Sequence, residues 1–152
     1  MTVDFTWKKV PALHVASIVR KGPWNENILR PEFRQLVKWA RSNKLRDGRW
    51  IFRFGPDERR WEACLEIRGK AKPEKPIRLR VLPAATVASV TFDPEEISPR
   101  VIYHGLNDWL KWRKKDGEIK SVGASREVYP GDPWTDKRAA AHTEIQFTVR
   151  KK

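Results

Sequence analysis

An internal repeat constrains the fold of this chain more than any other feature of its sequence. The segment VPALHVASI at residues 10–18 returns as LPAATVASV at residues 82–90, with five of the nine positions identical. A helical pattern of apolar residues follows each copy, and two strand-like runs follow each helical pattern. Self-similarity at a fixed spacing is typical of a duplicated structural unit, so the sequence predicts two related halves.

The two helical patterns match each other. The first has an apolar face over residues 29–40, with Gly48 beyond its end, and the second opens at Ser98-Pro99 and is ended by Gly117. At a spacing of 70 residues, three large side chains correspond in the two patterns. The corresponding pairs are Phe33 with Tyr103, Leu36 with Leu106, and Trp39 with Trp109.

Two predicted strands precede each helix and two follow it, so each half is a strand–strand–helix–strand–strand unit. Such a half leaves its sheet open, and joining the two sheets would cover it. We therefore expect an α+β fold with a mostly antiparallel sheet, helices on one face, pseudo-twofold symmetry and a ligand groove at the seam. The strands are predicted over residues 3–10, 10–18, 49–54 and 60–67, and over residues 77–81, 82–90, 120–129 and 142–149.

The segment that joins the two halves is basic and contains prolines, as a solvated linker does. We expect a single domain over residues 1–152, with a first half at 1–68, a basic linker at 69–76 and a second half at 77–152.

Composition excludes several classes of protein. With 39% hydrophobic residues and 8 Trp, the chain is not expected to be disordered. The single Cys64 cannot form an internal disulfide, and the N-terminus lacks the apolar core of a signal peptide. The longest apolar run contains a proline and is too short to span a bilayer. We expect a cytoplasmic protein that does not enter the membrane.

The formal net charge of +13 is the strongest bulk signal. It would attract nucleic acid without sequence preference, but the charge is spread along the chain and partly placed in the linker and at the C-terminus. Specific binding of nucleic acid is therefore not expected. The same charge would repel a cationic ligand at long range, or would suit an anionic one.

Residues with catalytic chemistry are sparse. His14, His104, His142 and Cys64 lack the spacing of metal ligands, and the 8 glycines form no phosphate-binding loop. No serine lies in a nucleophile-elbow pattern. The sequence predicts no metal, no cofactor and no conventional hydrolase or nucleotide-dependent enzyme.

One strand combines a carboxylate with an aromatic residue. In the segment GASREVYPGDPW, at residues 123–134, Glu127 and Tyr129 share one face and Arg126 the other, before Gly131 ends the strand. Glu127 could be a solvent-facing carboxylate paired with a neighbouring arginine, or it could line a cavity.

Four segments, in this order, resemble the GyrI-like (gyrase-inhibitor-like) effector-binding domain family. They are VASIVRKGPW at 15–24, FRQLVKWA at 33–40, REVYPGDP at 126–133 and HTEIQFTV at 142–149. The resemblance implies two SHS2-like halves with a ligand groove between them. It also implies the ligand-sensing part of a multidrug-responsive transcription regulator, or a stand-alone protein. Since no helix–turn–helix pattern precedes the first strand, we expect a stand-alone member.

The resemblance implies a role for Glu127 in the groove, where family members pair the equivalent glutamate with lipophilic cations. Tyr129 would lie beside it, and Glu144 is a weaker candidate whose counterpart in the first half is Glu62. The first half has no matching Glu-x-Tyr, so one half alone is expected to supply the ligand carboxylate. The aromatic candidates for the groove walls are Trp24, Trp61, Tyr103, Trp109 and Phe147, although core packing is the favoured interpretation for Trp109 and for Trp39.

Three functions follow from these observations. The first is binding of an amphipathic, cationic aromatic small molecule, whose bound state a separate regulator could read. The alternative is hydrolysis of an electrophilic, cyclopropane-type toxic compound, with Glu127 as general base and Tyr129 assisting. The second alternative is a basic interaction protein that acts on DNA gyrase or DNA, as the family's namesake does.

Overall fold

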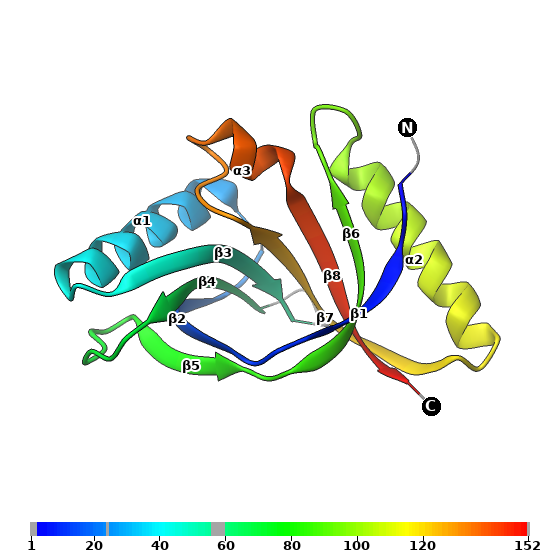
Figure 1. Ribbon diagram of the computed structural model, residues 1–152, viewed down its shortest axis with the longest axis horizontal. Helices are drawn as coiled ribbons and strands as arrows, with labels where there is room; N and C mark the ends of the chain where they lie inside the picture. Colours follow the sequence, from blue (N-terminus) through cyan, green and yellow to red (C-terminus); the bar gives the residue numbers. More distant parts are fainter. Residues whose placement is uncertain (1–2, 24, 56–59, 152) are drawn as a thin grey trace.

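The computed structural model describes residues 3–23, 25–55 and 60–151, and it confirms the α+β class and the duplicated order of elements (Figure 1). The first half contains β1 (Thr6–Val10), β2 (Leu13–Lys21), α1 (Glu26–Ser42), β3 (Arg46–Phe54) and β4 (Arg60–Arg68). The second half contains β5 (Arg78–Leu82), β6 (Ala85–Phe92), α2 (Pro99–Lys115), β7 (Ile119–Tyr129), a short helix α3 (Lys137–Ala141) and β8 (Thr143–Lys151). The helix α3 was not predicted.

All eight strands form one antiparallel sheet in the order β1-β6-β8-β7-β3-β4-β2-β5. The two halves meet in the middle, where β3 pairs with β7. They also exchange strands at the ends, because β1 of the first half pairs with β6 of the second and β5 pairs with β2. Each half therefore completes the sheet of the other.

The repeated Pro-Ala dipeptide lies at the point of this exchange. The chain bends at Pro11 between β1 and β2, and at Pro83 between β5 and β6. The register continues unchanged across both bends, from Val10 opposite Ala85 to Leu13 opposite Leu82. Since proline has no backbone N–H to donate to a ladder, the interruption falls where the chain turns.

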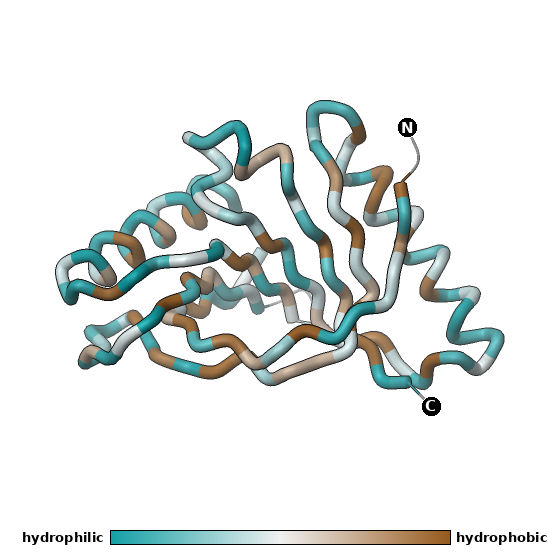
Figure 2. The backbone as a smooth tube through the Cα atoms, viewed as in Figure 1, coloured by the Kyte–Doolittle hydropathy of each residue, from teal (hydrophilic) through white to brown (hydrophobic). Residues whose placement is uncertain are grey.

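Both long helices pack on the same face of the sheet, α1 over the first half and α2 over the second, and α3 lies between them at the top of Figure 1. Each helix covers its own core, which includes Phe33 and Leu36 in the first half and Leu106 and Leu110 in the second. Figure 2 shows the same division, with apolar stretches along the strands and along one side of each helix. Trp39 packs in the first core, with 5% of its surface exposed.

The helix ends follow their local sequence. In α1, the Asn25 side chain accepts a hydrogen bond from the backbone N–H of Asn27. In α2, Ser98 caps Arg100 in the same way and Pro99 is the first residue. The helix α1 ends at Ser42, before Gly48, where Asn43 caps the last turn and Lys44 takes the left-handed conformation (φ 57°).

No helix in the described ranges is both long enough and apolar enough to cross a membrane.

Loss of one buried leucine should destabilise the whole molecule in a single step. Leu106 on α2 is fully buried, so Leu106→Ala removes packed methyl groups and leaves a cavity. We expect a loss of about 2–5 kcal/mol in the free energy of unfolding. Urea titration followed by tryptophan fluorescence and by circular dichroism should give one coincident transition, because the two halves share strands.

Val101→Ala, on the same helix but at a side chain that is 61% exposed, is the matched control and should change stability by less than about 0.5 kcal/mol. Two separate transitions in the Leu106→Ala protein would show that the exchanged strands do not make the halves cooperative.

Candidate functional site

An aromatic cleft of about 290 Å³ lies on the helix-covered face, between the start of α1, the middle of the sheet and the segment after β7. Its described lining includes two carboxylates, from Glu26 and Glu127, and no lysine or arginine. In a chain with a net charge of +13, this is a locally acidic environment. The remaining lining residues that matter most are aromatic: Phe33, Trp50, Phe52, Phe92, Tyr129 and Trp134.

The carboxylate of Glu127 is held by two hydroxyl groups. Tyr103 on α2 donates a hydrogen bond to Oε1 at 2.6 Å, and Tyr129 on the same strand donates to Oε2 at 2.7 Å. Tyr129 reaches this position because residues two apart on a strand point to the same face. Among the residues that the structure describes, no cation forms an ion pair with Glu127.

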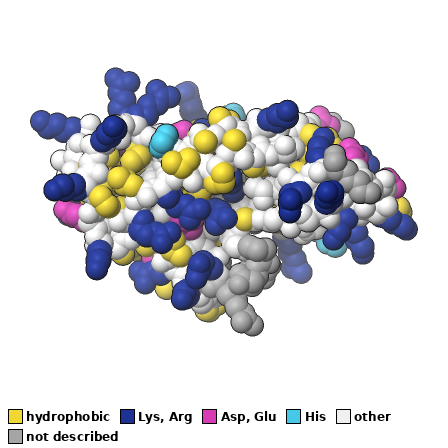
Figure 3. Space-filling model, turned by 90° about the horizontal axis from the view of Figure 1, so that it is seen from below, with side chains coloured by type: hydrophobic (Ala, Val, Ile, Leu, Met, Phe, Trp, Pro, Cys, Tyr) yellow, Lys and Arg dark blue, Asp and Glu magenta, His cyan; other side chains and the backbone are white. Residues whose placement is uncertain are grey.

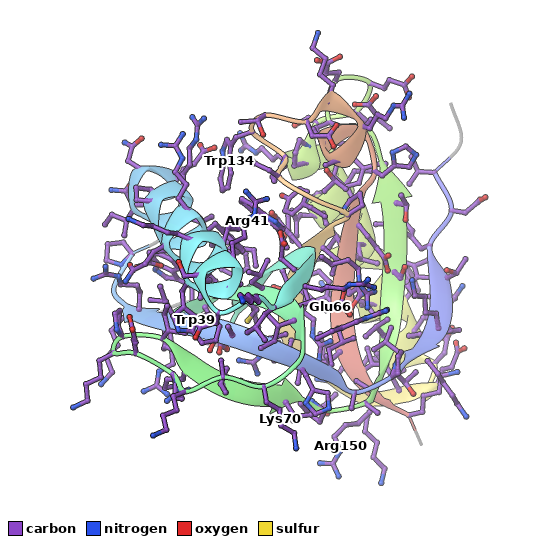
Figure 4. All side chains as sticks on the ribbon, turned by 60° about the vertical axis from the view of Figure 1, so that its left-hand side comes forward. Trp39, Arg41, Glu66, Lys70, Trp134 and Arg150 are labelled. Atoms are coloured by element: carbon purple, nitrogen blue, oxygen red, sulfur yellow. The ribbon has the colours of Figure 1, made fainter. Side chains whose placement is uncertain are left out.

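The aromatic wall is built from α1, β3 and the segment after β7. The rings of Phe33 and Trp50 stack with centroids 4.7 Å apart, and Trp134 lies 6.1 Å from each of them. The Trp134 indole N–H donates to Glu26 at 2.8 Å, and its backbone N–H donates to Asp132 at 2.9 Å. Figure 4 shows Trp134 between α1 and the loop that follows β7. These bonds hold the ring at the edge of the cleft.

The cleft is asymmetric although the fold is duplicated. Phe52 of the first half lies directly opposite Glu127 of the second half in the β3–β7 ladder. At the seam between the halves, one half thus presents a ring and the other a carboxylate.

Both tyrosine hydroxyls keep their protons at neutral pH. Burial raises the pKa of Tyr103 and of Tyr129 well above the ordinary value, and the negative charge and hydrogen bond of Glu127 raise both pKa values further. The two side chains therefore act as fixed O–H donors toward Glu127.

A larger hollow, of about 940 Å³, adjoins the cleft at Trp50 and lies between α1 and the loop after β7. Its rim carries mixed charges, including Arg34, Arg41 and Asp132. Arg41 is labelled on α1 in Figure 4. Since this hollow lacks a convergent set of polar groups comparable to Glu127 and its two tyrosines, we place the candidate site in the aromatic cleft.

The candidate residues suggested by sequence do not all meet there. Glu127 and Tyr129 line the cleft, Tyr103 reaches Glu127, and the Phe147 ring packs edge-on to Tyr103 at 6.1 Å. Trp24 lies outside the described residues.

Trp61 and Trp109 do not line the cleft. Trp61 is 2% exposed and stacks behind the lining on Phe52, with ring centroids 5.7 Å apart. Trp109 instead packs against the second core, where its ring lies 4.7 Å from that of Trp7 and 6.1 Å from that of Phe5.

Glu144 and Glu62 lie on the opposite face of the sheet. The neighbour of Glu144 on β8, Ile145, packs under α2, so Glu144 itself points away from the helices. Glu144 pairs there with Lys8 at 2.8 Å and accepts hydrogen bonds from Ser89 and Gln146. Burial raises the pKa of Glu144, but the hydrogen bonds and the charge of Lys8 outweigh this effect and lower it below the ordinary value.

The sequence did not identify the aromatic wall. Trp50 and Phe52 alternate on β3 in the pattern of a strand whose rings face a core, and they are indeed buried. Trp134 follows a turn of glycine and prolines, a context that gives no sign of its direction. Among the described residues, no group of three or more His, Cys, Asp or Glu side chains is arranged to hold a metal ion.

A sequence model for the family described as "GyrI-like small molecule binding domain" matches residues 4–150. A search of curated proteins finds no match.

Solved structures share the fold at low sequence identity. The EcmrR C-terminal domain is 22% identical, with a TM-score of 0.72 and 100% of both chains covered. EcmrR in a complex with DNA is 23% identical, with a TM-score of 0.75, and the match covers 99% of this chain but 58% of EcmrR. SAV2435 bound to tetraphenylphosphonium is 8% identical, with a TM-score of 0.57 and coverage of 97% and 94%.

Ultraviolet titration of phenolate should test the geometry around Glu127, because Tyr103 and Tyr129 are the only two tyrosines in the chain. In the folded protein we expect little phenolate near pH 10, the ordinary pKa, whereas the unfolded chain should ionise there. Since the folded pKa values are the higher ones, their contribution to stability is complete below about pH 10 and declines above it.

In Glu127→Gln, ionisation should begin at a lower pH than in wild type, because the negative charge of Glu127 no longer raises the tyrosine pKa values, while burial still raises them. Glu74→Gln, in the exposed segment between β4 and β5, should titrate as wild type does. Phenolate formation near pH 10 in the native protein would contradict the hydrogen-bonded arrangement.

Proposed function

The chain belongs to the GyrI-like small molecule binding domain family, and we propose that it binds a compact aromatic cation in the cleft beside Glu127. The observation that carries this proposal is the state of the Glu127 carboxylate. It faces aromatic rings, accepts hydrogen bonds from two neutral hydroxyls and has no ion-pair partner among the described residues.

Electrostatics in the cleft favour a positive ligand. A carboxylate that is partly removed from water regains interaction energy when a cation approaches it. At about 4 Å and an effective dielectric constant near 20, the attraction is about 4 kcal/mol before desolvation is subtracted. The net charge of the chain opposes this only at long range, because physiological salt screens charges beyond about 8 Å.

The rings supply attraction that does not depend on one ligand shape. Phe33, Trp50 and Trp134 present aromatic surface next to the carboxylate, and each ring face can add about 0.5–2 kcal/mol of cation–π attraction. The guanidinium of Arg30 already lies 5.9 Å from the Trp134 ring, which indicates that this ring accepts a cation. Rings with few rotatable bonds also lose little entropy on binding.

A relative with the same fold supports this class of ligand. SAV2435 binds tetraphenylphosphonium, a cation whose charge is surrounded by aromatic rings. The cleft volume of about 290 Å³ lies at the small end of the range for ligand pockets, so the cleft suits a compact cation of this chemistry.

Calorimetric titration with tetraphenylphosphonium, and with the smaller benzyltrimethylammonium, tests the proposal. Wild type should bind at least one of them, and Glu127→Gln should weaken binding about tenfold to a hundredfold because the counter-charge is lost. Trp134→Ala should also weaken binding, through loss of a ring face.

Two controls separate this site from bulk effects. Glu74→Gln makes the same change of charge on an exposed segment and should bind as wild type does. Tetraphenylborate has the shape of tetraphenylphosphonium with the opposite charge and should bind much more weakly to wild type. Equal binding of both ions, or no effect of Glu127→Gln, would overturn the proposal.

The same geometry favours one second candidate, hydrolysis of an electrophilic compound that carries a strained cyclopropane ring. Glu127 would accept a proton from water while the water oxygen bonds to a ring carbon. A carbon–carbon bond of that same ring carbon would break, its electron pair would pass to the neighbouring carbon, and that carbon would take up the proton that Glu127 had accepted. Tyr129 would keep the carboxylate oriented toward the water through its hydrogen bond of 2.7 Å.

Mass spectrometry of an electrophilic cyclopropane incubated with the protein should reveal the addition of one water if this reaction occurs. Glu127→Gln should abolish the addition, and Tyr129→Phe should slow it by about a hundredfold or more. Binding of the compound without any turnover would eliminate the second candidate and leave the binding function in place.

A further inference from the structure

A basic hollow lies on the face of the sheet opposite the cleft. Its volume is about 420 Å³, and it is bordered by side chains from four neighbouring strands, β3, β4, β2 and β5. Figure 3, which views the molecule from below, shows Lys and Arg side chains gathered near the middle of that surface. Among the residues that the structure describes, the charged lining consists of Lys21, Arg53, Arg60, Arg78 and Arg80, with Glu62 as the one acid.

Glu62 neutralises only part of this charge. Its side chain is 3% exposed, and Oε1 lies 3.2 Å from Arg80 and 3.7 Å from Arg53. Its second oxygen, Oε2, is buried and accepts no hydrogen bond from the described residues. Within the described ranges, Lys21, Arg60 and Arg78 form no ion pair at all.

Like charges face one another across the ladders at this place. Lys21 lies directly opposite Arg60 in the β2–β4 pair, and Arg53 lies directly opposite Arg126 in the β3–β7 pair. Like charges in directly opposed positions destabilise a sheet. The arrangement is therefore unfavourable for the free protein unless a further negative charge is present.

Arg126 adds a buried cation beside the hollow. It is 3% exposed, and its Nε is buried with no hydrogen-bond partner among the described residues. Burial, together with the positive charges of Arg53 and Arg80, lowers the pKa of Arg126. A buried cationic N–H without a hydrogen-bond partner is costly, so this side chain also favours an added anion nearby.

We propose that this hollow binds a small phosphate-bearing anion. Guanidinium groups donate paired hydrogen bonds that match the oxygen geometry of phosphate, and four arginines line this hollow from the strands β3, β4 and β5. A phosphate group carries close to two negative charges at neutral pH, so it offsets more of the excess than one carboxylate would. The residues surround a hollow instead of following a line, which suits a small molecule better than a duplex backbone.

The hollow and the aromatic cleft share strands but not faces. On β3, Phe52 points to the cleft and Arg53 to the hollow, and on β7 Glu127 points to the cleft while Arg126 points to the opposite face. The anion site therefore does not depend on the ligand proposed for the cleft.

Calorimetric titration with inorganic pyrophosphate at constant ionic strength tests the assignment. We expect wild type to bind pyrophosphate and Arg80→Gln to bind it at least about tenfold more weakly. Arg80→Gln also removes an ion-pair partner of Glu62, so a second variant, Arg78→Gln, is needed. Arg78 is exposed and forms no ion pair in the described structure, so its replacement leaves the packing intact. The matched control is Lys111→Gln, an exposed position on α2, with affinity within about twofold of wild type.

A short DNA duplex, titrated in parallel, distinguishes a free anion from a nucleic-acid backbone. Weaker pyrophosphate binding in Arg78→Gln than in Lys111→Gln supports the site. Absence of pyrophosphate binding, or equal affinities in these two variants, overturns it. If the wild-type protein binds the duplex more tightly than pyrophosphate, and Arg78→Gln weakens duplex binding, the assignment to a small molecule is overturned. The arginines would then contact the phosphates of a nucleic acid.

Discussion

The exchange of edge strands between the two halves is the constraint on which the rest of this structure depends. Strand β1 belongs to the first half in sequence but completes the sheet of the second, and β5 does the reverse. The ladder continues with one register across the bends at Pro11 and Pro83, so neither half has a complete sheet without the other. Together with the central β3–β7 pairing, this fixes the relative position of α1 and α2.

The aromatic cleft is a consequence of that fixed position. Glu127 and Tyr129 come from a central strand of the sheet, Tyr103 from α2, and the rings beside them from α1 and β3. A central strand pairs on both sides, so its backbone is held more firmly than a loop, and a site built on it is preorganised. At the seam, Phe52 of the first half lies opposite Glu127 of the second, and this pair makes the cleft one-sided in charge.

The alternation of side chains along a strand explains how a strongly basic chain presents an acidic cleft. Successive residues of β3 and β7 point to opposite faces, so Phe52 and Glu127 face the helices while Arg53 and Arg126 face away. Positive charge gathers on the open face around Glu62, and the described lining of the cleft contains no basic residue. The bulk charge of +13 is therefore not informative about the cleft, although it is informative about the opposite face.

The repeat, the helical periodicity and the alternation in strands were sufficient to predict the α+β class, the order of the strands and of the two long helices, and the common face of Glu127 and Tyr129. These properties depend on residues close in sequence. The sequence also pointed to Tyr103 through its correspondence with Phe33. It could not show that Trp61 is buried behind Phe52, or that Glu144 and Glu62 lie on the other face. Strand pairing decided these positions, along with the approach of Trp134 to Phe33 and the meeting of arginines from different strands. Such contacts join residues far apart in the chain, and the local sequence pattern of a strand does not determine which distant strand will pair with that strand.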